Sequence, residues 1–336
     1  MSGGVDSSVA AAIIKNEGFE CIGATMRLHG CGENDAEDAK KVALSLDIPH
    51  YVFDFSGDFE KEVIDRFVSA YENGLTPNPC IECNKHIKFK TLLNKAAELG
   101  CSHIVTGHYA RIVEQDGRFL LKKGLDSTKD QSYVLYSLTQ DELSRTLLPL
   151  GNLEKSAVRE YADKLSFVNA NKSDSQDICF VPDGDYAAFI ERYTKKNYPA
   201  GDFVDTKGNV LGKHRGIIRY TVGQRKGLGL ALPCPMYVLK KDLQQNRVVL
   251  CESKQLFTDN LETWDFNWVA FAPPDQPFKA LVKTRYKAKE AAATVTPLDN
   301  GKRVFIEFET PQRAITPGQA AVVYIGDTVI GGGTIK

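Results

Sequence analysis

Apolar residues in the first half of the chain alternate between helical and strand spacing. Residues 35–46 place their apolar positions on one helical face, which predicts an amphipathic helix. Short apolar runs predict strands at 21–26, 50–55 and 102–106, and further helical patterns lie at 59–71 and 91–99. This order predicts an α/β fold over residues 1–183, with a Rossmann-like parallel sheet covered by helices on both faces. Such sheets bind ligands at the carboxyl ends of their strands.

Beyond residue 183 the pattern changes to short strands separated by turns. One more helix is predicted at 186–193. Turn-forming residues then occur at 205–209, 244–246 and 299–301, between alternating strands such as 304–308 and 321–325. No long helical pattern follows. The second half is therefore predicted to form two small antiparallel, barrel-like β domains, at residues 184–252 and 253–336.

Composition limits the classes of protein to which the chain can belong. Its 336 residues suffice for two or three domains, and its net charge of −1 restricts any nucleic-acid binding to local basic patches. No apolar run reaches transmembrane length and no signal-peptide pattern precedes the first motif. Eight cysteines without a secretory signal indicate a reducing compartment, so we expect a cytoplasmic protein.

The first residues are typical of a phosphate-binding turn that leads into a helix. Two glycines let backbone N–H groups approach an anion, and helix-forming residues 9–15 follow. The loop is not of the Walker type, because no Gly-Lys-Ser/Thr follows. Asp6 would repel phosphate, which suggests a Mg²⁺-bound nucleotide. The turn could instead be a helix cap without a ligand, and the strand from which such loops normally extend is missing here.

Two further segments carry candidate reactive thiols. Cys80 and Cys83 lie in a proline-rich segment just ahead of a predicted helix, whose N-terminus would lower a thiol pKa. The pair could equally be half a zinc site, a redox pair or a chance surface pair. Cys179 follows the polar residues 174–177. A nucleotide loop together with these cysteines suggests sulfur transfer, in which one thiol carries a persulfide and the other resolves it.

The motifs together resemble the bacterial tRNA-specific 2-thiouridylase (MnmA) family, within the PP-loop ATP pyrophosphatases. The matching segments follow the family's order along nearly the whole chain: 2–8, 78–84, 106–111, 129–133, 175–180 and 221–227. The resemblance implies an enzyme, a tRNA-uridine 2-sulfurtransferase. Such an enzyme uses ATP to adenylate the wobble uridine and then replaces its C2 oxygen with sulfur from a cysteine persulfide.

The resemblance also implies a role for each matching residue. Cys83 would be the nucleophile and Cys179 the persulfide carrier. ATP would bind to Ser2, Gly3, Gly4, Val5, Asp6, Ser7, Ser8, Met26 and Gly107. The target base would approach Asn78, Pro79 and Cys80, and the remaining tRNA contacts would be Lys129, Asp130, Gln131, Arg285 and Tyr286.

The implied partners are tRNAs with wobble-uridine anticodons, such as those for Lys, Glu and Gln, and a cysteine desulfurase or sulfur-relay protein as donor. Cys80 departs from family members that have aspartate there. Cys80, Cys83 and Cys179 could therefore hold a [4Fe–4S] cluster, as an alternative to a Cys83/Cys179 redox pair. An ATP pyrophosphatase acting on a small molecule would leave the thiols unexplained. A metal-holding, tRNA-binding module without turnover is the remaining alternative.

Basic residues suggest where RNA could bind. The denser group lies at 213–215, 219 and 225–226, and suits an RNA backbone. Lys283, Arg285, Lys287 and Lys289 alternate as on an ordinary exposed strand face.

Overall fold

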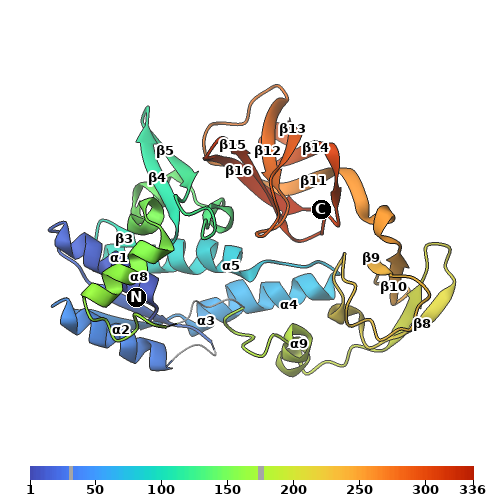
Figure 1. Cartoon of the computed structure of the whole chain (residues 1–336), viewed down its shortest axis with the longest axis horizontal. Helices are drawn as coiled ribbons and strands as arrows, with labels where there is room; N and C mark the ends of the chain where they lie inside the picture. Colours follow the sequence, from blue (N-terminus) through green and yellow to red (C-terminus); the bar gives the residue numbers. More distant parts are fainter. Residues whose placement is uncertain (30–32, 173–177) are drawn as a thin grey trace. The chain divides into compact units, whose positions relative to one another are not determined.

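The computed structural model describes residues 1–29, 33–172 and 178–336 (Figure 1). The polar residues 174–177, which the sequence analysis placed before Cys179, lie outside this range. The chain divides into two compact units. Unit 1 comprises Met1–Ile64, Pro79–Phe180 and Ile325–Gly331, and unit 2 comprises Asp65–Asn78, Val181–Tyr324 and Gly332–Lys336. Among the described residues, no helix combines the length and apolar composition that crossing a membrane requires.

Unit 1 begins with an alternation of helices and parallel strands. Its first elements are α1 (Val5–Asn16), β1 (Gly23–Arg27), α2 (Glu33–Ser45) and β2 (His50–Asp54). Strands β1 and β2 pair in parallel, and α1 packs against α2 and α8 (Lys155–Lys164; Figure 1). The alanine-rich sequence of α1 favours a helix, and its Val5, Val9 and Ala12 are buried in the core. The predicted strands at 21–26 and 50–55 and the predicted helix at 35–46 are thus confirmed.

The helical segments at 59–71 and 91–99 are longer than predicted. The first consists of α3 (Ser56–Phe59) and η1 (Glu60–Ile64) in unit 1, followed by α4 (Asp65–Glu72), which is assigned to unit 2. The second begins at Pro79, with α5 (Pro79–Glu82), η2 (Cys83–Thr91) and α6 (Leu92–Glu98). Both η1 and η2 are π-helical, a form that is rare and is frequently found at functional sites. The prediction that the Cys-x-x-Cys pair lies just ahead of the helix is wrong, because both cysteines are helical.

The rest of unit 1 holds a second parallel pair and a hairpin that was not predicted. The parallel pair is β3 (Ile104–Val105) with β6 (Thr146–Leu147). The hairpin is β4 (Ala110–Gln115) with β5 (Arg118–Lys123), and β5 pairs with Thr328. Short helices complete the unit: η3 (Ser132–Leu135), α7 (Gln140–Ser144) and η4 (Pro149–Asn152).

Unit 2 contains a small four-stranded sheet after the predicted helix, α9 (Tyr186–Thr194). The strand order is β8-β7-β10-β9, with β7 (Gly201–Val204), β8 (Val210–His214), β9 (Tyr237–Asp242) and β10 (Arg247–Cys251). A short helix, η5 (Ile217–Arg219), follows β8. The expectation of antiparallel pairing is met except between β10 and β7, which are parallel.

A closed barrel forms the last part of the chain (Figure 1). Its strands pair in the order β11-β14-β13-β12-β15-β16, and β16 returns to β11. They are β11 (Phe257–Trp268), β12 (Phe278–Lys283), β13 (Ala291–Leu298), β14 (Arg303–Arg313), β15 (Ala320–Ile325) and β16 (Thr328–Ile335). Two short helices, η6 (Ser253–Leu256) and η7 (Asp299–Gly301), lie between them. Closure leaves no unpaired edge strand, as predicted for a barrel-like domain.

We predict that Gly301→Ala destabilises the barrel by about 1–3 kcal/mol more than Gly326→Ala, a change in the turn between β15 and β16. Both glycines have positive φ, +81° and +61°, so alanine is strained at either site. Only at Gly301 would the added methyl also meet neighbours, namely the ring of Pro273 and the Trp268 indole nitrogen. Urea unfolding followed by tryptophan fluorescence measures both variants. Equal losses of stability would show that packing at Gly301 is unimportant.

Candidate functional site

Helix α1 begins at a turn that leaves its first N–H groups open. Gly4 is the N-cap residue, and no side chain caps the helix. Gly3 has a φ of +71°, and a methyl group there would overlap the backbone carbonyl of Asp35. The turn therefore requires glycine at this position. Uncapped N–H groups at a helix N-terminus bind anions, and this agrees with the phosphate-binding turn predicted from the sequence.

Serine hydroxyls hold the turn together from within. Ser7 Oγ accepts a hydrogen bond from the Ser2 backbone N–H (3.0 Å) and donates to the Gly4 carbonyl (3.0 Å). Ser8 Oγ also donates to the Gly4 carbonyl (3.1 Å) and is fully buried. The predicted ATP-binding serines thus shape the backbone of the turn.

Three residues far along the chain complete this turn, and none of them was predicted from the sequence. Asn169 is 2% exposed and donates to the Gly3 carbonyl (3.0 Å) and to Ser8 Oγ (2.9 Å). Lys172 Nζ bonds to the Gly3 carbonyl (3.3 Å) and bridges Asp35 and Asp38 of α2. Lys155, at the start of α8, is the third residue. No local motif marks any of the three.

The carboxylate of Asp6 is held by a lysine and a tyrosine. Asp6 Oδ1 lies 2.6 Å from Lys155 Nζ and accepts a hydrogen bond from the Tyr109 hydroxyl at 2.7 Å. Lys155 is only 8% exposed, and its ammonium group also lies over the Tyr109 ring. Asp6 therefore already has a buried cation that compensates its charge, a contribution that the predicted Mg²⁺ ion was expected to make alone.

Gly107 and Met26 lie at strand ends of unit 1, as ligand-binding residues of such folds do. A methyl group on Gly107 would come within 2.7 Å of the Asp6 carbonyl carbon and 2.8 Å of the Ser7 nitrogen. Gly107 is therefore packed directly against the first turn of α1. Met26, near the end of β1, is half-buried and lies opposite Phe53 in the β1–β2 ladder.

Cys83 is buried in the helix rather than exposed at its start. It is the first residue of η2, and burial raises its pKa to about 11. The predicted lowering of its pKa by a helix N-terminus is therefore wrong, since four helical residues precede it in α5. The charge of Lys88 opposes this rise. In a π-helix each N–H bonds to the carbonyl five residues earlier, as Leu92 does to Ile87. Lys88 is also five residues after Cys83, so the two residues are one π-helical turn apart.

Cys80 and Cys179 lie near Cys83, and both have exposed side chains. Phe180, next to Cys179, packs edge-on against Phe59 of α3 with ring centroids 5.7 Å apart, and α3 contacts η2. Although the Cys80 residue is exposed, the protein around its sulfur raises its pKa; the charge of Lys88 lowers this pKa and the charge of Cys179 raises it. The structure thus brings the three predicted thiols together within unit 1.

The described residues offer no ready metal site. No group of three or more His, Cys, Asp or Glu side chains in ranges 1–29, 33–172 and 178–336 is arranged to hold a metal ion.

The residues predicted to contact tRNA in segment 129–131 have structural partners in unit 1. Asp130 accepts hydrogen bonds from the backbone N–H groups of Gly124 and Ser132, both at 3.1 Å. Gln131 accepts from the Tyr109 N–H through its side chain (3.0 Å) and donates its own N–H to the Tyr109 carbonyl (2.8 Å). The segment thereby positions Tyr109, while Lys129 is half-buried beside it.

Arg285 and Tyr286 follow β12 in unit 2. The guanidinium of Arg285 donates to the carbonyls of Val222 (3.0 Å) and Ala314 (2.9 Å), and to the Thr316 hydroxyl. Residues 285–289 are not in a strand, so the expectation of an alternating exposed strand face is wrong beyond Lys283. Tyr286 lies half-buried, under the ammonium group of Lys283.

The denser basic group in unit 2 is smaller than the sequence suggests. Lys213 pairs with Asp202, His214 is buried, and Arg219 pairs with Glu191. Within the described chain, the exposed cations that lack an ion pair in this group are Arg215, Arg225 and Lys226.

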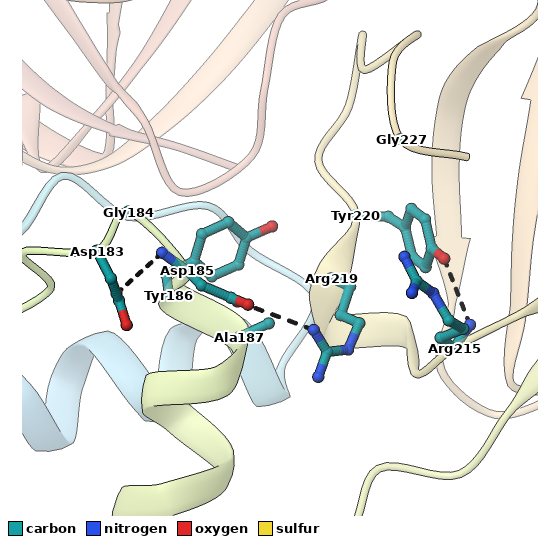
Figure 2. A pocket seen from close by; sticks show the side chains of 9 residues that line it. All are labelled: Asp183, Gly184, Asp185, Tyr186, Ala187, Arg215, Arg219, Tyr220 and Gly227. Atoms are coloured by element: carbon teal, nitrogen blue, oxygen red, sulfur yellow. Dashed lines mark hydrogen bonds and ion pairs between the residues drawn. The ribbon is translucent and has the colours of Figure 1, made fainter. Parts of the chain in front are cut away.

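Arg215 and Arg219 line a pocket of about 300 Å³ in unit 2 (Figure 2). Asp183, Asp185 and Tyr186 line it too, and Figure 2 shows Arg219 directed toward Asp185, at 3.8 Å. The Tyr220 hydroxyl accepts a hydrogen bond from the Arg215 backbone N–H at 3.3 Å, which fixes the base of the basic side chain.

We predict that Lys88→Met raises the pKa of Cys83 further and slows its alkylation, because the variant removes the cation that favours the thiolate. In the unmodified protein, the alkylation rate rises with pH until the pKa near 11 is reached. Iodoacetamide labelling across pH, read by peptide mass spectrometry, measures both effects. Lys90→Met, an exposed change in the same helix, is the matched control. Identical pH profiles for the two variants would contradict the role of Lys88.

Comparison with known proteins covers the whole chain. Three family models match: a tRNA methyl transferase HUP domain at residues 1–183, a tRNA methyl transferase PRC-barrel domain at 187–252, and an aminomethyltransferase beta-barrel domain at 258–335. They confirm the predicted α/β class with two following β domains.

Several curated proteins named tRNA-specific 2-thiouridylase MnmA are similar to the chain over its full length. The Acetivibrio thermocellus protein is 50% identical over 351 residues, which cover 100% of this chain and 98% of that protein. The proteins of Lachnoclostridium phytofermentans and Clostridium acetobutylicum are 49% and 47% identical, with the same coverage. With the nucleotide-type turn and the three thiols in one unit, these similarities show that the chain belongs to the tRNA-specific 2-thiouridylase MnmA family.

Proposed function

We propose that this protein is a cytoplasmic tRNA-uridine 2-sulfurtransferase that uses ATP to replace the C2 oxygen of a wobble uridine with sulfur. The observation that carries the proposal is the presence, in unit 1, of both an uncapped helix N-terminus and three neighbouring thiols. A ligase acting on a small molecule would need the first feature but not the second. The relatives are named tRNA-specific 2-thiouridylase, and thiolation of a uridine would use both the nucleotide-type turn and the thiols.

ATP is proposed to bind with its phosphates at the first turn of α1. The open N–H groups of residues 4–7 would hold phosphate oxygens, and the Asp6–Lys155 pair would keep the carboxylate from repelling them. Ser2, Gly3, Val5, Ser7 and Ser8 shape this turn, and Gly107 packs against it. Met26 would contact the adenine. Mg²⁺ would arrive with ATP, bound to the phosphate oxygens.

Adenylation is the proposed first reaction. The extruded uridine would lie near Asn78, Pro79 and Cys80. Its C2 oxygen attacks the α-phosphate of ATP, and pyrophosphate leaves. This step converts a poor leaving group, the carbonyl oxygen, into AMP.

Sulfur transfer is the proposed second reaction. Cys179, which is exposed, receives a persulfide from a cysteine desulfurase or sulfur-relay protein. The terminal sulfur attacks C2 and AMP departs. Cys83 attacks the inner sulfur of the persulfide, and its electron pair forms the Cys83–Cys179 disulfide as the S–S bond to the transferred sulfur breaks. This scheme needs thiols rather than a [4Fe–4S] cluster.

Basic residues are proposed to contact the tRNA backbone. Lys129, Asp130, Gln131, Arg285 and Tyr286 match family positions for such contacts. Arg215, Arg225 and Lys226 are better placed for direct phosphate contacts, since they are exposed and have no ion pair within the described residues. The partly buried guanidinium of Arg285 is held by the Val222 and Ala314 carbonyls, so it would instead shape the local backbone.

We predict that Cys179→Ser still releases pyrophosphate in the presence of tRNA but yields no thiolated tRNA, because serine cannot carry a persulfide. The assay combines protein, ATP, a persulfide donor and unmodified tRNA, and measures pyrophosphate together with the mass of the wobble nucleoside. Cys234→Ser, which alters an exposed thiol of unit 2, is the control and should thiolate normally. Thiolation by Cys179→Ser would refute its role, and failure of the unmodified protein would refute the function.

We predict that Lys155→Met weakens ATP binding by about tenfold, or about 1.4 kcal/mol, because Asp6 then carries an uncompensated charge beside the phosphates. Calorimetry with a non-hydrolysable ATP analogue measures the affinity. Lys164→Met changes an exposed lysine of the same helix and should leave it unaltered. An affinity equal to that of the unmodified protein would show that the ion pair has no part in nucleotide binding.

A further inference from the structure

The Cys83–Cys179 disulfide formed in each turnover creates a problem for the next one. Cys179 must be a thiol again before it can accept another persulfide. The Cys83 half of the bond is buried, with a residue exposure of 9%. A thiol that is already part of the site would have the shortest path to this bond.

Cys80 is such a thiol. The backbone of Glu82 is α-helical (φ −63°, ψ −41°), so α5 continues into η2 without a break. Residues three apart in a helix lie on the same face, with Cβ atoms about 5–6 Å apart. Disulfide bonds need Cβ atoms about 3.5–4.5 Å apart, so a small movement in this first helical turn would join Cys80 to Cys83.

The surroundings of the three sulfurs give them different tasks. Cys80 and Cys179 are exposed, whereas Cys83 is buried, and burial raises its pKa to about 11. The charges of both Cys80 and Cys179 act on Cys83, so each lies within electrostatic reach of its sulfur. Cys83 can therefore be the shared partner of two alternative disulfides.

We propose that Cys80 is a resolving thiol for the reaction, an inference that rests on the proposed function. The Cys80 thiolate attacks the Cys83 sulfur of the Cys83–Cys179 disulfide. A Cys80–Cys83 bond forms, the Cys83–Cys179 bond breaks, and its electron pair leaves on Cys179 as a thiolate. The exchange needs no external oxidant or reductant, because one disulfide replaces another.

The products of this exchange suit the next turnover. Cys179, exposed and reduced, can take up persulfide sulfur at once. The new disulfide has an exposed end at Cys80, where a cellular dithiol can attack. The dithiol is oxidised to a disulfide, and Cys80 and Cys83 become thiols again. The Cys-x-x-Cys spacing thus serves reduction, separately from any contact of Cys80 with the target base.

The test maps disulfides after one turnover. The reduced full-length protein is incubated with ATP, unmodified tRNA and a persulfide donor without added reductant, quenched with N-ethylmaleimide, and analysed by non-reducing peptide mass spectrometry. We expect thiolated tRNA together with a Cys80–Cys83 disulfide and a Cys179 that is alkylated or reloaded with persulfide. Thiolated tRNA with Cys83–Cys179 as the sole disulfide would overturn the inference alone. Absence of thiolated tRNA would refute the proposed function itself.

Two cysteine variants test the role of Cys80 directly. In Cys80→Ser, the Cys83–Cys179 disulfide should accumulate and Cys179 should not be reloaded, while Cys234→Ser should behave as the unmodified protein. A second measurement uses only the unmodified protein, equilibrated without tRNA in dithiol redox buffers. Formation of Cys80–Cys83 at potentials where Cys83–Cys179 also forms supports the exchange. Failure of Cys80–Cys83 to form at any potential that oxidises Cys83 overturns it, whether or not Cys80→Ser folds.

Discussion

The ion pair between Asp6 and Lys155 is the interaction on which the first turn of α1 depends. A carboxylate at a helix N-terminus is favourable by itself, but it would repel a second anion at the same place. Lys155 removes this conflict, and the Tyr109 hydroxyl fixes the same carboxylate oxygen. Because Gly3 and Gly107 are also packed against neighbouring backbone, the turn can present little other than its N–H groups. The ability of this turn to bind an anion therefore depends on close backbone packing and on the Asp6 charge being compensated by Lys155.

Local patterns predicted the elements of the fold more completely than they predicted the site. Alternating apolar runs were sufficient for the first strands and for the change to β structure after residue 183. The β4–β5 hairpin was missed although Asp116-Gly117, a strong turn signal, lies at its tip with φ of +52° and +75°. Lys155 and Asn169 could not be predicted, because nothing near them in the sequence indicates which distant turn they complete. Arg285 had the residue type of an RNA contact, but long-range packing directs its guanidinium to backbone carbonyls.

The thiols show how burial can outweigh position in a helix. A Cys-x-x-Cys pair near a predicted helix suggested reactive thiolates, yet the helix begins earlier and Cys83 is enclosed by protein. A thiol with a pKa near 11 is almost entirely protonated at neutral pH, so it resists alkylation and oxidation while no substrate is present. Its reactivity would then depend on changes around the sulfur when a ligand enters. Exposed Cys179 would suit the proposed task of accepting sulfur from a protein donor.

The π-helical form of η2 has a consequence for how this segment tolerates changes in length. A π-turn holds one more residue than an α-turn, so η2 resembles an α-helix that has absorbed an insertion. Deleting one residue between Cys83 and Lys88 would let ordinary α geometry return. Residues beyond the deletion would then keep their faces, because the π-turn had absorbed the extra residue, whereas the separation of Cys83 from Lys88 would fall from five residues to four. The distance between the Cys83 sulfur and the Lys88 ammonium group thus depends on the number of residues between them as well as on the residue types.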